Sequence, residues 1–207
     1  MKTRLIIVRH GETEYNTQKK YQGQSESPLT ERGREQAGCA AERLRNEKID
    51  IIYSSPLSRA LDTAKIIRGP KNIEITTDRR LAEIKCGEWE GVVFDELKER
   101  YPQEMDTWLN RPTLHRMPGG ETLADVKARA DELLAEILQK HEGETILIVT
   151  HVILVLLLMI RFAGENIEDI WSTPKQLNAS INIVEVEGGK ATIITRAEQP
   201  APSIVWD

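Results

Sequence analysis

The chain has 207 residues, of which 40% are hydrophobic and 29% are charged, an ordinary balance for a globular protein built on one core. Its 28 Lys and Arg against 33 Asp and Glu give a formal net charge of −5, without the basic surplus of a general nucleic-acid binder. A small cationic pocket stays compatible with that charge. Two distant cysteines, Cys39 and Cys86, predict reduced thiols and no disulfide framework.

The first part of the chain alternates apolar runs with amphipathic segments. Three runs predict buried strands, at residues 5–8, 49–53 and 73–76. Thr30 is placed to cap a helix between the first two strands. Ser55-Pro56 predicts the start of a second helix, with Pro at its first position, and Gly69-Pro70 predicts its end. This β-α-β-α-β order predicts a mainly parallel sheet with helices on both faces.

The later part of the chain predicts a small helical insertion followed by a return to the sheet. The expected elements are helices at 94–100, 102–109 and 123–138, a strand at 145–149, a helix through Phe162, and a hairpin of 181–186 with 191–195. We interpret the chain as one domain over 1–207, with a cap insertion at about 81–120 and an irregular tail at 199–207 that includes Trp206. The apolar stretch 146–160 is shorter than the ~20 residues of a membrane-spanning helix, so we expect no membrane association.

Charged and imidazole side chains stand where the predicted strands end. Arg9, His10 and Gly11 follow the first strand, and His151 follows the strand at 145–149. Ligands of open α/β sheets bind at the carboxyl ends of the strands, and Arg binds phosphate or carboxylate through paired hydrogen bonds. Arg59 lies in the first turn of a helix, where a cation is mildly unfavourable. These residues predict an anion site, with a capped strand end and a structural ion pair of Arg59 as the alternatives.

Three segments together resemble the signatures of the histidine phosphatase superfamily, the phosphoglycerate mutase-like family: Arg9-His10-Gly11-Glu12, Ser54-Ser55-Pro56-Leu57-Ser58-Arg59 and Val149-Thr150-His151. The similarity covers nearly the whole chain and includes residues 21–23, 28–33 and 81–91. It implies a three-layer α/β/α fold with a mainly parallel central sheet and a small helical cap. Val152 departs from the Gly that many members carry after the second His, so we expect a more apolar pocket wall there.

The resemblance also implies a role for individual residues. His10 would attack the phosphoryl group and become a phosphohistidine that water hydrolyses, while Arg9, Arg59 and His151 would bind the phosphoryl oxygens. That attack requires an unprotonated ring nitrogen on His10, so we expect a backbone carbonyl to hold the other N–H. Glu83 would protonate the leaving alkoxide, which requires a raised pKa.

Other residues near these motifs are alternative acids or additional contacts of the pocket. Glu88 and Glu90 compete with Glu83 for the role of the acid. Asn16, Gln22 and Val152 would make additional contacts in the substrate pocket. The Asn178-Ala179-Ser180 segment either lines that pocket or is a plain loop before the hairpin.

The function that we predict is hydrolysis of a small phosphorylated metabolite by a metal-independent phosphomonoesterase. The branch that it resembles includes broad-specificity phosphatases, α-ribazole phosphatases and cofactor-independent phosphoserine phosphatases. A cofactor-dependent phosphoglycerate mutase is the alternative, although those chains are longer, and a non-catalytic phosphate-binding regulatory module is a third possibility. His115 and His141 show no metal-ligand spacing, so we expect no metal or cofactor. We expect a cytoplasmic monomer or homodimer without nucleic-acid partners.

Overall fold

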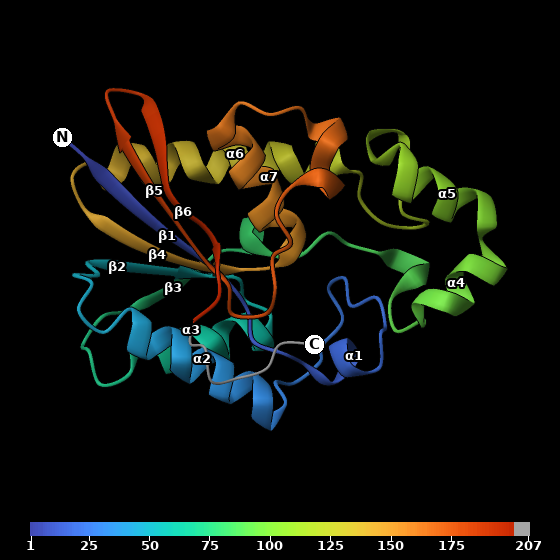
Figure 1. The fold of residues 1–207 in the computed structure, drawn as a ribbon, viewed down its shortest axis with the longest axis horizontal. Helices are drawn as coiled ribbons and strands as arrows, with labels where there is room; N and C mark the ends of the chain where they lie inside the picture. Colours follow the sequence, from blue (N-terminus) through green and yellow to red (C-terminus); the bar gives the residue numbers. More distant parts are fainter. Residues whose placement is uncertain (201–207) are drawn as a thin grey trace.

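A six-stranded sheet forms the centre of the protein in the computed structural model, which describes residues 1–200. The strands are β1 (Thr3–Arg9), β2 (Ile51–Ser54), β3 (Ile75–Thr77), β4 (Thr145–Thr150), β5 (Ile181–Glu187) and β6 (Lys190–Glu198). They lie in the order β3-β2-β4-β1-β5-β6, and the first four are mutually parallel. The hairpin β5–β6 adds two antiparallel strands beside β1. The expected mainly parallel sheet with a terminal hairpin is therefore confirmed (Figure 1).

Helices cover both faces of this sheet, as the alternating pattern predicts (Figure 1). One face carries α2 (Glu31–Arg43) and α3 (Ser58–Arg68), and the other carries α6 (Leu123–Lys140) and α7 (Val152–Ala163). Successive residues of a strand point to opposite faces, so β1 contributes to two cores. Ile6 and Val8 belong to one hydrophobic cluster, whereas Leu5 and Ile7 belong to the other. This arrangement confirms the three-layer α/β/α fold.

Helix ends show where local signals decide the structure and where tertiary contacts override them. Thr30 caps α2 by accepting a hydrogen bond from the Gly33 amide, as expected. The prediction that Pro56 opens the next helix is wrong, because α3 begins at Ser58. The Ser55 amide still donates to the Val149 carbonyl at 3.0 Å, so the chain continues the strand pairing and turns only afterwards. The third strand likewise starts two residues later than the apolar run, at Ile75.

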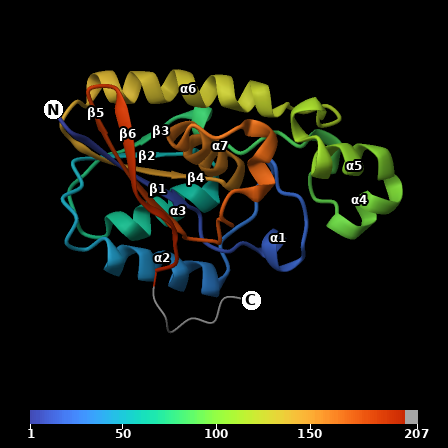
Figure 2. The same cartoon turned by 45° about the horizontal axis from the view of Figure 1, so that its top comes forward.

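A cap of short elements projects beyond the carboxyl ends of the strands (Figure 2). It contains α4 (Phe94–Arg100), α5 (Pro102–Asn110) and the short 3-10 helices η2 (Gly87–Trp89) and η3 (Pro112–Leu114), and η1 (Arg79–Leu81) precedes it in the chain after β3. Two of these confirm the helices expected at 94–100 and 102–109, the second with one further residue. The buried side chains of Trp89, Leu97 and Met105 join the same hydrophobic cluster as Leu5 of the sheet. The cap therefore packs on the sheet layer that carries α6 and α7.

Two remaining segments complete the chain around the site. The four-residue helix α1 (Glu14–Thr17) was not expected, and η4 (Ile167–Ser172) follows α7. The apolar stretch 146–160 forms β4 and the buried part of α7, and no helix within residues 1–200 is long and apolar enough to cross a membrane. Gln199 and Pro200 lie outside helices and strands, and the rest of the expected tail, with Trp206, falls outside the described residues.

Candidate active site

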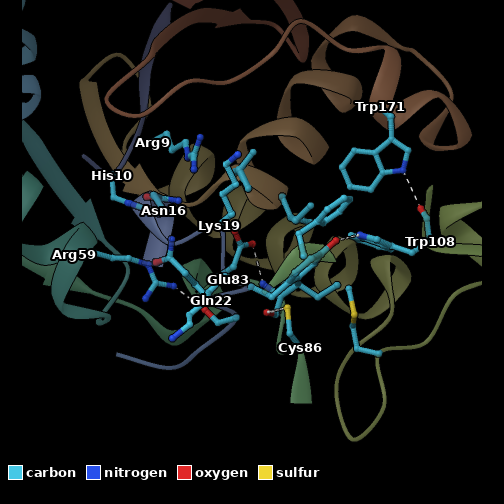
Figure 3. Close-up of a pocket in the computed structure, with 18 residues that line it drawn as sticks. Arg9, His10, Asn16, Lys19, Gln22, Arg59, Glu83, Cys86, Trp108 and Trp171 are labelled. Atoms are coloured by element: carbon cyan, nitrogen blue, oxygen red, sulfur yellow. Dashed lines mark hydrogen bonds between the residues drawn. The ribbon is translucent and has the colours of Figure 1, made fainter. Parts of the chain in front are cut away.

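A cavity of about 430 Å³ opens at the carboxyl ends of the strands, between the sheet and the cap. Seven of the residues expected in the site line it: Arg9, His10, Asn16, Gln22, Arg59, Glu83 and Val152. The eighth, His151, is not among the lining residues but lies next to His10, with 5.1 Å between the ring centroids. Figure 3 shows the charged residues at one end of this cavity and the tryptophans at the other. The structure thus brings together residues that are up to 143 positions apart in the sequence, from Arg9 to Val152.

His10 ends the first strand and is 2% exposed. Its Nδ1 lies 2.7 Å from the carbonyl oxygen of Gly11. A carbonyl only accepts hydrogen bonds, so Nδ1 carries the proton and Nε2 keeps a free lone pair. Burial, together with the nearby charges of Arg59 and Arg9, holds the pKa of His10 well below its usual value. The ring is therefore neutral at pH 7, with the geometry that nucleophilic attack requires.

His151 stands at the N-cap of α7 and is fully buried. Its Nε2 lies 2.7 Å from Oγ of Ser55, which already accepts a hydrogen bond from the Leu57 amide. Within residues 1–200 the proton of that buried hydroxyl has no acceptor other than Nε2, so Ser55 donates to Nε2 and His151 carries its own proton on Nδ1. This Nδ1 has no hydrogen-bond partner within the described part of the chain. His151 is thereby prepared as a neutral donor for a ligand atom, and burial keeps its pKa low.

Two arginines bring uncompensated positive charge to the cavity. Arg59 is fully buried and donates from its two terminal nitrogens to the carbonyls of Ser25 and Gly23, at 2.8 and 2.6 Å. Arg9 donates to the Gln176 carbonyl at 2.7 Å. Burial lowers the pKa of Arg9 to about 10, so it stays charged at neutral pH. Among residues 1–200 neither arginine forms an ion pair, and both are oriented by carbonyls of the backbone. Their arrangement therefore favours binding of an anionic ligand over a structural ion pair.

Glu83 is the one acidic side chain among the residues that line the described cavity. It is 6% exposed, and its Oε1 accepts a hydrogen bond from the Ile84 amide at 2.9 Å. Burial raises its pKa, against the opposing effects of that amide and of Arg59. Its competitors are placed differently. Glu90 accepts hydrogen bonds from the amides of Gln24 and Cys86 and from the Ser25 hydroxyl, whereas Glu88 is exposed.

Arg129 of α6 holds the segment that carries Glu83, a part that sequence reasoning missed. One terminal nitrogen donates to the carbonyls of Arg80 and Ala82, both at 2.7 Å, and the other donates to the Glu83 carbonyl at 3.1 Å. A signal was present, because Arg129 directly precedes Ala130 on the apolar stripe of its helix. A charged side chain at the edge of a buried stripe needs buried acceptors.

The amide side chains near His10 form a small network. The Oδ1 of Asn16 accepts a hydrogen bond from the amide of Thr13, the N-cap residue of α1. The same oxygen accepts a second hydrogen bond from the side chain of Asn178. Asn178 also donates to the carbonyl oxygen of His10 at 3.2 Å, so it braces this turn and is more than a plain loop residue. Gln22 also lines the cavity, and its buried Oε1 has no hydrogen-bond partner among the described residues. Val152, the first residue of α7, adds the expected apolar wall.

Aromatic residues from four segments form the outer end of the cavity: Tyr21, Phe94, Trp108 and Trp171. Their polar atoms bind one another, since the Trp108 Nε1 donates to the Tyr21 hydroxyl at 3.1 Å and the Trp171 Nε1 donates to the Trp108 carbonyl at 2.9 Å. Tyr21 and Phe94 stack with 6.0 Å between their centroids. No local sequence signal marks this wall, because loops and helices that are distant in the chain each supply one of its members. Within the described residues, no group of His, Cys, Asp and Glu could hold a metal ion.

Comparison with known proteins agrees with this geometry. The family model described as histidine phosphatase superfamily (branch 1) matches residues 5–199. Phosphoserine phosphatase 1 of Hydrogenobacter thermophilus is 35% identical over 92% of this chain and 90% of its own, and the metal-independent phosphoserine phosphatase of Arabidopsis thaliana is 35% identical over 91% and 78%. The solved structure of Bacillus stearothermophilus YhfR superposes with a TM-score of 0.91 at 40% identity, covering 95% of this chain and 97% of that one.

Proposed function

Since this chain belongs to the histidine phosphatase superfamily and is an enzyme that hydrolyses phosphate esters, we propose that it acts through a phosphohistidine on His10, with Glu83 as the general acid. The observation that carries this proposal is the hydrogen bond between His10 Nδ1 and the Gly11 carbonyl. It leaves Nε2 unprotonated inside a cavity that also holds two free guanidinium charges. A neutral nucleophile beside fixed cations suits attack on an anionic phosphoryl group.

In the first step, Nε2 of His10 attacks phosphorus while the bond to the leaving oxygen breaks. Arg9, Arg59 and the Nδ1–H of His151 would stabilise the charge on the phosphoryl oxygens. Phosphoryl transfer asks for this positioning and charge stabilisation above all. Glu83, kept protonated by burial, would give its proton to the departing alkoxide.

In the second step, water attacks the phosphohistidine and the P–N bond breaks. The carboxylate of Glu83 now takes a proton from that water, which returns the acid to its starting state. His10 recovers its lone pair, and inorganic phosphate leaves. The substrate that we propose is a small phosphorylated metabolite; the phosphoserine phosphatases among the relatives make phosphoserine the first compound to try.

The test is turnover of p-nitrophenyl phosphate by the purified protein in the presence and absence of EDTA. We expect equal rates, because the proposed steps use only side chains of this chain. Loss of activity on chelation, with recovery on adding a metal, would contradict the proposal. A second measurement offers 3-phosphoglycerate and follows both inorganic phosphate and 2-phosphoglycerate. Hydrolysis without isomerisation is expected, and sustained isomerisation would favour the mutase alternative.

A further inference from the structure

Lys19 occupies the cavity in a backbone conformation that favours glycine. Its φ angle is 53°, in the left-handed region that side chains disfavour. Two hydrogen bonds fix it there, from the Lys19 amide to the Asn16 carbonyl and from the Phe94 amide to the Lys19 carbonyl, at 3.1 and 3.0 Å. The loop and the cap thus hold a lysine at a position where glycine would fit with less strain.

The ammonium of Lys19 has neither an ion pair nor a hydrogen bond among residues 1–200, although its side chain lines the cavity. Figure 3 places it between Arg9 and Glu83, near the middle of the cavity. Its neighbour Lys20 differs, since that ammonium lies 5.4 Å from the centre of the Tyr15 ring. Glu83 is the acidic residue that lines the same cavity, but the first step of the proposed mechanism needs it protonated and therefore uncharged. Lys19 therefore adds positive charge that the protein itself leaves unbalanced.

Beyond Lys19, the aromatic wall at the outer end of the cavity has few free polar atoms that could bind a substrate. The indole nitrogens of Trp108 and Trp171 are engaged with the wall itself, as described above. A phosphate held by Arg9 and Arg59 would project its leaving group past Lys19 toward this apolar end. A cation at that point attracts a second anionic group on the leaving group.

We propose that Lys19 is a subsite for a second anion, so that the preferred substrates are phosphate monoesters whose leaving group carries a carboxylate. This inference rests on the proposed function, since it assumes that the phosphoryl group binds at Arg9 and Arg59. The side chain is exposed, so its contribution is that of one partly solvated charged hydrogen bond. That contribution corresponds to about tenfold in kcat/KM.

The experiment compares 3-phosphoglycerate with glycerol 3-phosphate, which differ by a carboxylate in place of a hydroxymethyl group. The protein should favour 3-phosphoglycerate in kcat/KM, and Lys19→Gly should lower that preference about tenfold. Glycine accepts the left-handed backbone, so this variant removes the charge and relieves strain together. Lys19→Arg should keep most of the preference. Lys140→Ala, which removes an exposed lysine at the end of α6, is the matched control and should change nothing.

Each other outcome has a distinct meaning. An unchanged preference in Lys19→Gly would overturn the subsite. An equal loss with both substrates would also overturn it, because Lys19 would then act on the shared phosphoryl group. Turnover of p-nitrophenyl phosphate, which carries no carboxylate, is measured in parallel. If that activity persists while the preference is absent, the subsite fails and the phosphatase mechanism stands.

Discussion

The two ends of the cavity are built in different ways. At the inner end, His10 and His151 directly follow neighbouring strands, and Arg59 lies in the first turn of α3. His10 and Arg59 donate to backbone carbonyls, and His151 pairs with the Ser55 hydroxyl, so hydrogen bonds orient all three side chains. At the outer end, aromatic rings from loops and the cap pack on one another, and Trp171 is 40% exposed. Rigid strand ends suit groups that need a fixed geometry, whereas loops and short helices tolerate change. We therefore expect the inner end to carry the proposed chemistry and the outer end to influence the choice of substrate.

The largest expected effect comes from removing the nucleophile. His10→Ala should lower kcat for every phosphate monoester by at least about a thousandfold, because the covalent route is lost. The rate is measured with p-nitrophenyl phosphate, and binding of inorganic phosphate and circular dichroism serve as controls for an intact inner end. A variant that binds phosphate and still turns over near the normal rate would refute the role of His10.

Glu83→Gln separates the acid from the rest of the inner end. Turnover of an alkyl phosphate should fall about 10²- to 10⁴-fold, since the alkoxide then leaves without a proton. Nitrophenolate is a good leaving group, so p-nitrophenyl phosphate should lose far less in the first step. Rates for both substrates are measured on one preparation, with Glu88→Gln as the matched control. Equal losses would mean that Glu83 acts in another way.

The pH dependence should carry the same signature. Burial raises the pKa of Glu83, so the acid stays protonated to a higher pH than an ordinary glutamate. Alkyl phosphate turnover should fall about tenfold per pH unit once the pH passes that raised pKa. The pKa of His10 lies well below its usual value, so His10 becomes protonated only at low pH. The fall in rate on the acid side of the pH profile should therefore lie below the usual range of a histidine. Alkaline limbs that are identical for alkyl and nitrophenyl phosphate would argue against this assignment.

Ser55→Ala tests how the second histidine is prepared. Without the hydroxyl, Nε2 of His151 loses its partner and the ring no longer has one preferred tautomer. We expect about a fivefold loss in kcat, equivalent to a net hydrogen bond of ~1 kcal/mol. Nitrogen NMR of labelled histidine should show the Nδ1–H tautomer only in the unaltered protein. If the tautomer persists in the variant, Ser55 is not the residue that sets it.

The smallest effect is expected at the outer end. Phe94→Ala removes a ring that stacks on Tyr21 and lines the cavity. KM for an aryl phosphate should rise about threefold, while small alkyl phosphates should keep their kinetics. Phe162→Ala, at the only other phenylalanine of the chain, is the control outside the cavity. A fall in kcat with all substrates would mean that the outer wall also supports the chemistry.

The same contrast explains what could be predicted from the sequence. His10 and His151 were predictable because each directly follows a strand, and Arg59 because it lies in the first turn of the helix after another strand. Parallel strands end at one edge of a sheet, which brings the three together. The start of α3 at Ser58 was not, because the pairing of Ser55 with Val149 on another strand decides it.

The outer wall shows the other limit of the sequence. Trp108 and Trp171 lie 63 positions apart, and nothing local marks them as neighbours. Lys19 gave no signal either, since its left-handed backbone is set by contacts with Asn16 and Phe94. Such features depend on tertiary packing, which overrides local preference.

The central claim is that His10 attacks through Nε2, and the phosphorylated enzyme tests it most directly. The protein is mixed with excess substrate, denatured within milliseconds in alkali, which preserves phosphohistidine, and studied by phosphorus NMR and peptide mass spectrometry. The account predicts an acid-labile phosphate on Nε2 of His10, because the Gly11 carbonyl holds the proton on Nδ1. Phosphate on Nδ1, or on another residue, would contradict it.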